Sequence, residues 1–257
     1  MRARRGAVRG EVAEVAEGVF RLEHAFVNVY LVTDDDGRVL VVDTGLPGTW
    51  DLLGRALRRL GRRPSDVEAV VLTHAHFDHT GSAARTQRVL GVPIWLHRED
   101  DEVAAHPYRY AHENVRGWYP LRYPASVRIL AAMVRAGALR VPGVSGARHA
   151  EPGAVLPLPG SPRVVFSPGH TPGHCALHLA DRDVLFTGDA LVTLDPYTSR
   201  RGPQIIAGAA TADSAQALRS LDDLAATGAG TLLPGHGEPW TGSVAAAVEE
   251  ARAVGAH

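Results

Sequence analysis

The sequence predicts an α/β fold, in which strands and helices alternate along one chain. Short β-branched runs such as Ala69–Leu72 are typical of buried strands, and segments such as Thr49–Leu60 carry apolar side chains at helical spacing. The chain has 257 residues, of which 45% are hydrophobic and 21% charged, so it is long enough to bury a sizeable core. No linker or internal repeat divides the sequence, and we expect a single domain over residues 1–257.

The first half of the chain alternates regularly between strands and helices. A turn at Asp34–Gly37 joins two apolar runs into a hairpin, and Gly61 ends the first amphipathic helix. The expected strands are Val19–Leu22, Asn28–Thr33, Val39–Val42, Ala69–Leu72 and Val92–Leu96, and the expected helices are Thr49–Leu60 and Gly81–Leu90. This alternation favours a sheet that is covered by helices.

The pattern changes at about residues 98–152, where acidic residues are followed by closely spaced Tyr and Trp side chains. We interpret this stretch as an insertion on the α/β core, with a helix at Ser126–Ala136. After it, strands are expected at Val164–Phe166, Leu177–Leu179, Val184–Phe186 and Thr231–Leu233, and helices at Ala212–Ala226 and Ser243–Val254. The second half of the chain therefore has the β-then-α order of the first.

Composition excludes several kinds of chemistry. All 27 basic residues are Arg, so the protein has no lysine for a phosphate-binding P-loop, a pyridoxal Schiff base or a Ser–Lys acylation pair. The net charge of -1 does not favour nucleic acid or an anionic membrane as a partner, and we expect a small-molecule substrate. A single Cys175, acidic residues after the N-terminal arginines and the lack of a long apolar run predict a cytoplasmic protein without a membrane span.

Residues of metal-ligand type follow five of the expected strands. Asp43, His74 and Asp189 come within three residues of an apolar run, whereas His170 and His236 follow across short turns that contain Pro and Gly. In α/β folds the functional groups gather where strands end. We therefore expect these five side chains on one rim of the fold.

The densest group is the segment Thr73–His79, in which three imidazoles and a carboxylate lie within six positions. In an extended chain His74 and His76 point to one side, and Asp78 and His79 can turn toward a second position. Imidazole and carboxylate ligands suit zinc, iron or manganese, and the lack of Cys ligands argues against a closed structural zinc site. The segment thus predicts an open, catalytic centre that serves two neighbouring metal ions.

Five short motifs together resemble the metallo-β-lactamase superfamily. They are Val42-Asp43-Thr44-Gly45, His74-Ala75-His76-Phe77-Asp78-His79, Pro168-Gly169-His170-Thr171-Pro172-Gly173-His174, Thr187-Gly188-Asp189 and Pro234-Gly235-His236-Gly237. They follow the order of the family and extend from about Val39 to Gly237. The resemblance implies a four-layer αβ/βα sandwich with a two-metal site on its edge.

The resemblance also implies a role for each residue of metal-ligand type. By position, the first metal would be bound by His74, His76 and His170, the second by Asp78, His79 and His236, and Asp189 would bridge the two. Asp43 would brace the ligand loop from behind, and His174 would pack behind the ligands rather than bind metal. The expected cofactor is a pair of Zn²⁺ ions, with iron or manganese as alternatives.

A two-metal site of this kind predicts hydrolysis of an ester, thioester or lactone. A hydroxide held between the metals would attack the carbonyl group, and Asp78 would orient that nucleophile. Antibiotic-hydrolysing members of the family use Cys where Asp189 stands, or lack the late Gly-His. The sequence is therefore more similar to the glyoxalase II and lactonase side of the family, and a β-lactamase or a nuclease is less favoured.

Other readings of the same motifs stay open. Lactonases often carry a Tyr shortly after the bridging Asp, whereas here Ala190-Leu191-Val192 follow and Tyr197 is the nearest candidate. A sulfur dioxygenase that binds one iron through His74, His170 and Asp189 is the alternative enzyme, and a non-catalytic or redox module is a third reading.

Aromatic side chains of the insertion are candidates for a wall of the substrate pocket, because they combine a large apolar area with polar tips. They could equally fill a small satellite core. The candidates are Tyr108, Tyr110, Trp118, Tyr119 and Tyr123, together with Tyr197 from the second half of the chain.

Overall fold

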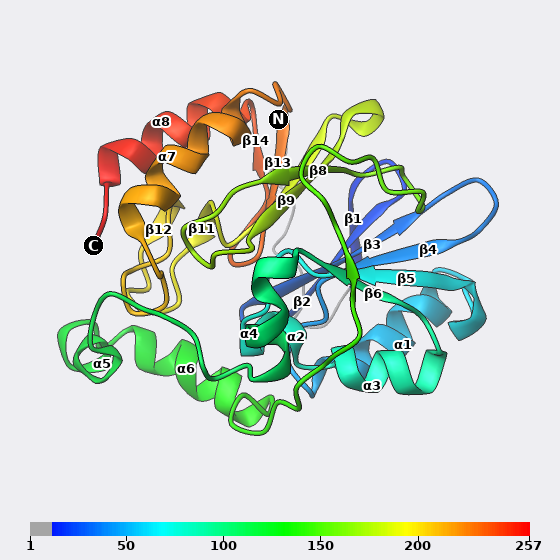
Figure 1. The fold of residues 1–257 in the computed structure, drawn as a ribbon, viewed down its shortest axis with the longest axis horizontal. Helices are drawn as coiled ribbons and strands as arrows, with labels where there is room; N and C mark the ends of the chain where they lie inside the picture. The colour runs from blue at the N-terminus through cyan, green and yellow to red at the C-terminus, as the bar shows by residue number, and fades with distance from the viewer. Residues whose placement is uncertain (1–11) are drawn as a thin grey trace.

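Two β-sheets pack face to face in the computed structural model, which describes residues 12–257 (Figure 1). The first sheet runs in the order β1 to β7, at Val12–Ala16, Val19–His24, Val27–Thr33, Val39–Val42, Val67–Val71, Ile94–Leu96 and Arg148–His149. The second has the order β14-β13-β10-β9-β8, at Trp240–Thr241, Thr231–Pro234, Val184–Gly188, Cys175–Leu179 and Arg163–Phe166. A small separate sheet pairs β11 (Val192–Leu194) with β12 (Arg201–Gln204).

Helices cover the outer face of each sheet (Figure 1). α1 (Thr49–Arg59) and α3 (Ala83–Leu90) pack on the first sheet, and α7 (Ser214–Ala225) and α8 (Val244–Val254) pack on the second. The other helices are α2 (Phe77–Thr80), α4 (Asp101–Ala105), α5 (Tyr119–Arg122) and α6 (Ser126–Arg135), with 3₁₀ turns at Pro64–Asp66, Arg98–Asp100, Arg116–Trp118 and Ala180–Arg182. The layer order of helix, sheet, sheet, helix confirms the predicted αβ/βα sandwich.

Strand β4 shows why its sequence is apolar at every position. Leu40 and Val42 point into the core between the two sheets, whereas Val39 and Val41 point into the core under α1. Successive side chains of a strand face opposite sides, so a strand that is buried on both faces needs an unbroken apolar run. Across the inter-sheet core, the rings of Tyr30 and Phe186 lie 5.1 Å apart between centroids.

The expected long elements are present, with small changes at their ends. The helix expected at Ala212–Ala226 begins at Ser214, because the Asp213 side chain caps it by accepting a hydrogen bond from the Gln216 N–H at 2.8 Å. The sequence did not indicate the short strands β1, β7, β11, β12 and β14. β7 returns the stretch at 98–152 to the first sheet, where it pairs in parallel with β6. Within residues 12–257, no helix has the length and apolar character needed to cross a membrane.

Candidate metal centre

Seven buried His and Asp side chains meet at one edge of the sandwich. They lie on the segments that follow β5, β8, β10 and β13, so both sheets contribute to the cluster, and α2 carries two of them. Each is at most 7% exposed. In chain order they are His74, His76, Asp78, His79, His170, Asp189 and His236.

Potential ligand atoms form three groups within this cluster, and the atoms of each group lie within 4.8 Å of one another. The groups are His74 with His76 and His170, His74 with His79 and Asp189, and Asp78 with His79 and His236. Asp189 lies between the first group and the last: its Oδ2 is 3.6 Å from Nε2 of His170 and 3.2 Å from Nε2 of His236. The structure thus brings together all seven residues that the sequence singled out as ligands.

Several of these ligand atoms are buried without a hydrogen-bond partner among the described residues. They are Nε2 of His74, His76, His79 and His170, and Oδ1 of Asp189. A buried polar atom that lacks a partner costs about 1–3 kcal/mol, and such atoms are rare in folded proteins. Because the unpaired atoms are imidazole nitrogens and a carboxylate oxygen gathered in one place, the donor set fits a bound metal ion.

The rings of His79 and His236 are held in place by hydrogen bonds from Nδ1, the nitrogen that does not face the cluster. Nδ1 of His79 donates to Oδ2 of Asp43 at 2.9 Å, and Nδ1 of His236 donates to the backbone carbonyl of Phe26 at 2.7 Å. These contacts direct Nε2 of each ring into the cluster, which is how proteins commonly orient histidine ligands of metals.

Asp43 also holds the start of the ligand segment. Its Oδ1 accepts a hydrogen bond from the Thr73 N–H at 2.8 Å, and its Oδ2 accepts one from the Thr73 hydroxyl at 2.9 Å. The Thr73 hydroxyl in turn lies 3.1 Å from Nδ1 of His74. One buried carboxylate therefore fixes the backbone before His74 and the ring of His79.

His174 belongs to none of the three ligand groups. Its Nε2 accepts hydrogen bonds from the backbone N–H groups of Asp189, at 3.0 Å, and of Ala190, at 3.2 Å. Its Nδ1 lies 2.8 Å from the Ser167 hydroxyl. Both ring nitrogens are thus engaged within the protein, and burial lowers the pKa of His174 to about 3, so the ring stays neutral.

Short backbone turns deliver the remaining side chains. His76 has an extended backbone and α2 begins at Phe77, so a helical turn carries Asp78 and His79 to the second group. Gly235 passes so close to the cluster that a Cβ atom there would lie 2.1 Å from Oδ1 of Asp189. Only glycine fits at this point, which explains the Pro-Gly-His order of the motif.

The histidines differ in their readiness to bind a metal. Burial lowers the pKa of His74 and His76 well below its usual value and lowers that of His170 to about 4. Burial also opposes a charge on His236, but nearby carboxylates, above all Asp189, outweigh it and raise its pKa to about 10. Neutral imidazole is the form that binds metals, so the first group is ready for an ion, whereas a metal must displace a proton from His236.

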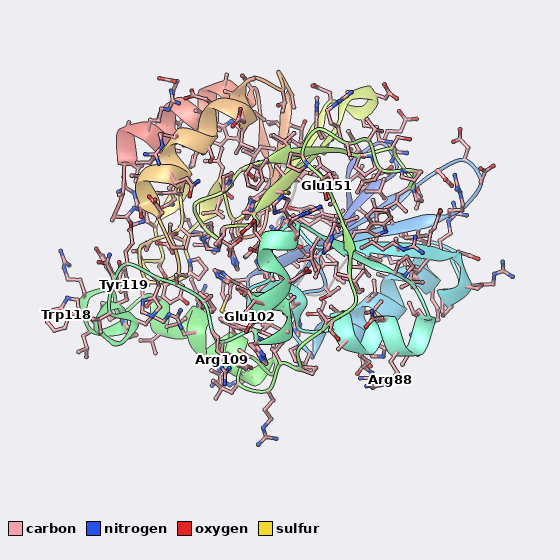
Figure 2. All side chains as sticks on the ribbon, viewed as in Figure 1. Arg88, Glu102, Arg109, Trp118, Tyr119 and Glu151 are labelled. Carbon is pink, nitrogen blue, oxygen red and sulfur yellow. The ribbon has the colours of Figure 1, made fainter. Side chains whose placement is uncertain are left out.

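The predicted pocket residues fall into separate places. Tyr110 and Tyr197 line a cavity of about 10 Å³ beside the cluster, and the Tyr110 ring lies 3.8 Å from that of His76 between centroids. Trp118, Tyr119 and Tyr123 line another pocket at α5, the outer pocket, of about 450 Å³, and none of the seven cluster residues lines it. Figure 2 labels Trp118 and Tyr119. Tyr108 lines neither pocket, and its hydroxyl donates to the Ala138 carbonyl at 2.9 Å.

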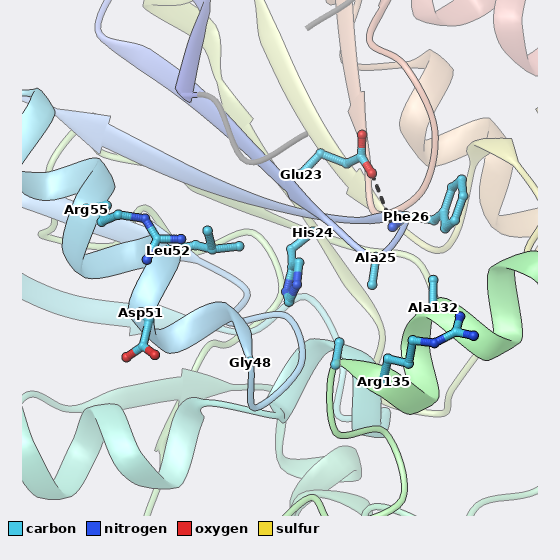
Figure 3. A pocket seen from close by; sticks show the side chains of 11 residues that line it. Glu23, His24, Ala25, Phe26, Gly48, Asp51, Leu52, Arg55, Ala132 and Arg135 are labelled. Atoms are coloured by element: carbon cyan, nitrogen blue, oxygen red, sulfur yellow. Dashed lines mark hydrogen bonds between the residues drawn. The ribbon is translucent and has the colours of Figure 1, made fainter. Parts of the chain in front are cut away.

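A further cavity, of about 540 Å³, opens between the β2–β3 hairpin, α1 and α6 (Figure 3). Figure 3 shows His24 between the two helices, with Arg55 on one side and Arg135 on the other. None of the seven cluster residues lines this cavity, so its size alone does not locate the functional site.

Sequence reasoning missed several partners of the site. The Thr211 hydroxyl lies 3.3 Å from Nδ1 of His170, and the guanidinium of Arg116 lies over the Tyr110 ring at 4.1 Å. Nε of Arg116 donates to the carbonyl of Ala209, two residues before Thr211, at 2.9 Å. Neither residue belongs to a motif, and only their proximity in the fold reveals them.

The sequence profile of the metallo-beta-lactamase superfamily matches residues 23–236, a span that contains the whole cluster. The chain belongs to the metallo-β-lactamase superfamily. The match includes the first four motifs quoted above and the fifth as far as His236, so the family resemblance seen in the sequence is confirmed.

Individual relatives are similar over 64–89% of the chain. A probable metallo-hydrolase, YflN of Bacillus subtilis, is 28% identical over 89% of this chain and 87% of its own length. Hydroxyacylglutathione hydrolase GloC of Haemophilus influenzae is 25% identical over 64% of this chain and 66% of its own. The crystal structure of TTHA1623 in a di-iron-bound form has a TM-score of 0.61 and 28% identity, covering 86% of this chain and 92% of that protein.

Proposed function

We propose that this protein is a hydrolase that cleaves an ester, thioester or lactone with the help of two divalent metal ions, zinc in both positions. The observation that carries the proposal is the pair of ligand groups joined by Asp189. His74, His76 and His170 would hold one ion, and Asp78, His79 and His236 would hold the other. When bound, such a pair lowers the pKa of water and polarises a carbonyl oxygen.

Asp78 is the residue that we assign to orienting the attacking water. Its Oδ2 lies 3.3 Å from Nε2 of His236, and it lines the cavity beside the cluster. Burial favours the neutral acid, but the hydrogen bond from His236 and the nearby His79 outweigh it and lower the pKa of Asp78. The carboxylate is thus ionised at neutral pH and can accept a hydrogen bond from the attacking water.

The protein itself offers no competing thiol nucleophile. Cys175, the only cysteine, is buried in β9, and burial raises its pKa to about 12. A thiol with so high a pKa stays protonated and is a poor nucleophile. Activation of water is therefore the chemistry that the site supports, and the name of the Haemophilus influenzae relative supports an acyl substrate.

Metal content and substrate range test this proposal together. We expect purified, zinc-saturated protein to hold two equivalents by elemental analysis and to hydrolyse at least one member of a panel of carboxylic esters, thioesters and lactones. Removal of the metal with a chelator should abolish turnover, and added Zn²⁺ should restore it. One equivalent of iron, with oxygen uptake on a persulfide and no hydrolysis, would instead establish the sulfur dioxygenase.

Tyr110 lines the cavity beside the metal cluster, and we propose that it forms a wall of the substrate pocket and so affects substrate selectivity. Because its ring packs on His76 and lines the small cavity, we expect Tyr110→Ala to change the ratio of kcat/KM between a bulky and a small acyl substrate by about 10-fold or more, with metal content retained. Trp118→Ala is the matched comparison, because that indole is 64% exposed and lines the outer pocket. Equal changes in the two variants would count against Tyr110 as the wall.

A further inference from the structure

Asp100 is a buried carboxylate that belongs to none of the three ligand groups. It ends the 3₁₀ turn Arg98–Asp100, directly before α4, and its exposed fraction is 0%. Burying a carboxylate is costly unless its oxygens are hydrogen-bonded, so such a residue needs strong local partners. Its neighbours Glu99, Asp101 and Glu102 are exposed, which sets Asp100 apart from an ordinary run of surface acids.

The partners of Asp100 lie on two different ligand segments. Its Oδ2 accepts hydrogen bonds from the Ala75 N–H at 2.9 Å and from the Thr171 hydroxyl at 2.8 Å. Its Oδ1 accepts one from the Gly173 N–H at 2.8 Å. Ala75 stands between His74 and His76, and Thr171 directly follows His170.

These two segments come from different sheets. His74 and His76 follow β5 of the first sheet, and His170 follows β8 of the second, yet the three residues form one ligand group. The two sheets are also joined nearby by a backbone hydrogen bond from Cys175 to Thr73, of 2.8 Å.

The approach of the second segment to Asp100 is very close. A Cβ atom at position 173 would lie 2.7 Å from Oδ1 of Asp100, so the contact is possible only with glycine there. The glycine of the Thr-Pro-Gly-His sequence therefore has a physical reason that concerns Asp100 rather than a ligand.

We propose that Asp100 is a positioning residue: it sets the spacing between the segment of His74 and His76 and the segment of His170, and thereby the metal affinity of this one ligand group. The inference rests on the proposed function only in assuming that the group binds a metal. The second group, made by Asp78, His79 and His236, has no contact with Asp100 and should keep its affinity.

Asp100→Asn is the sharpest variant, because it preserves shape and removes one acceptor. Three donors hydrogen-bond to the two oxygens of the carboxylate, whereas an amide has a single oxygen. In the Asn variant the NH₂ group therefore lies against at least one N–H or O–H donor, and that hydrogen bond is lost. The matched control is Asp101→Asn, whose carboxylate lies near the surface and contacts His149 at 2.8 Å.

The experiment is a titration of the metal-free, full-length protein with Zn²⁺ against a chromophoric chelator, which resolves two affinities. We expect Asp100→Asn to weaken one of them by about 10–100-fold and to leave the other unchanged, with Asp101→Asn like the unmodified protein. Unchanged affinities in Asp100→Asn would overturn the proposal, and so would a lower unfolding temperature of the metal-free protein without a change in affinity, because that result describes a purely structural residue.

A second pair of variants decides the question if Asp100→Asn does not fold. Thr171→Val removes a single donor to Asp100 and should weaken the same affinity, whereas Thr171→Ser keeps the hydroxyl and should restore it. Equal affinities in the Val and Ser variants would overturn the proposal. Because the readout is metal binding, a selective loss in the variants supports the role of Asp100 even if no substrate in the panel is hydrolysed.

Discussion

Asp189→Asn is expected to remove tight metal binding and turnover together. The carboxylate lies within 3.9 Å of Nε2 of four histidines. His74 and His170 belong to the first ligand group, and His79 and His236 belong to the group that contains Asp78. Asparagine has nearly the same shape, but it is uncharged and its nitrogen cannot accept or ligate. The activity should therefore fall by more than the roughly 100-fold that is typical of losing a residue behind the ligands.

The measurement is metal content after gel filtration, followed by kcat on the best substrate. Asp181→Asn, at an exposed position of the turn Ala180–Arg182, controls for the effect of the substitution type on yield and folding. An Asp189→Asn protein that kept two metal equivalents and the full rate would refute the bridging position and the hydrolytic mechanism with it.

The strand ends explain why so much of the site could be predicted from sequence. Val70, Val71 and Leu72 are apolar because both faces of β5 are covered, and the first polar residues after them, beginning with Thr73, stand at the edge of the sheet. The apolar run of β10 likewise stops at Thr187, before Asp189, and that of β13 is followed by Pro234-Gly235-His236. A fold that buries its strands completely therefore places its chemistry where the apolar run stops.

Elements that depend on pairing rather than on their own pattern could not be predicted. β1 is at the edge of the first sheet, is only partly buried, and carries Glu14 in its middle, so its sequence lacks the signature of a buried strand. α2 has four residues, too few to show a helical period. Both exist because neighbouring segments hold them.

Contacts made by the backbone leave no trace in the sequence either. His236 is oriented by the carbonyl of Phe26, in a β2–β3 turn where Ala25 and Phe26 both have positive φ, 53° and 69°. Turns with positive φ at both central residues favour Gly, Asn or Asp, so the Ala-Phe sequence does not predict a turn at this place. Asp100 was hidden for the opposite reason, since three acidic neighbours made it look like part of a solvated run.

The two histidines of the Pro-Gly-His-Thr-Pro-Gly-His segment, His170 and His174, should differ strongly in their effect on metal content when each is replaced by alanine. His170→Ala removes a ring whose Nε2 faces the cluster without a partner among the described residues, so one ligand group loses a member. We expect the purified variant to retain at most one metal equivalent and to lose nearly all activity. The change should not unfold the protein, because the only hydrogen-bond contact of the ring among the described residues is the 3.3 Å contact to the Thr211 hydroxyl. The ring also contacts the rings of His74 and His76, at 4.8 and 4.5 Å between centroids, and that of His174.

His174→Ala should behave differently, although it lies only four residues away. The substitution leaves the buried N–H of Asp189 without its acceptor, at a cost on the order of 1–3 kcal/mol, so the unfolding temperature should drop. The N–H of Ala190 loses one of two acceptors and keeps the Thr187 carbonyl at 3.1 Å. Both metals should stay bound, and kcat should fall by about 10–100-fold as Asp189 loses its support. His174→Gln, which can return an acceptor oxygen near the position of Nε2, should recover part of the loss. A greater loss of metal in His174→Ala than in His170→Ala would mean that the second histidine is the ligand, and the assignment along this segment would have to be reversed.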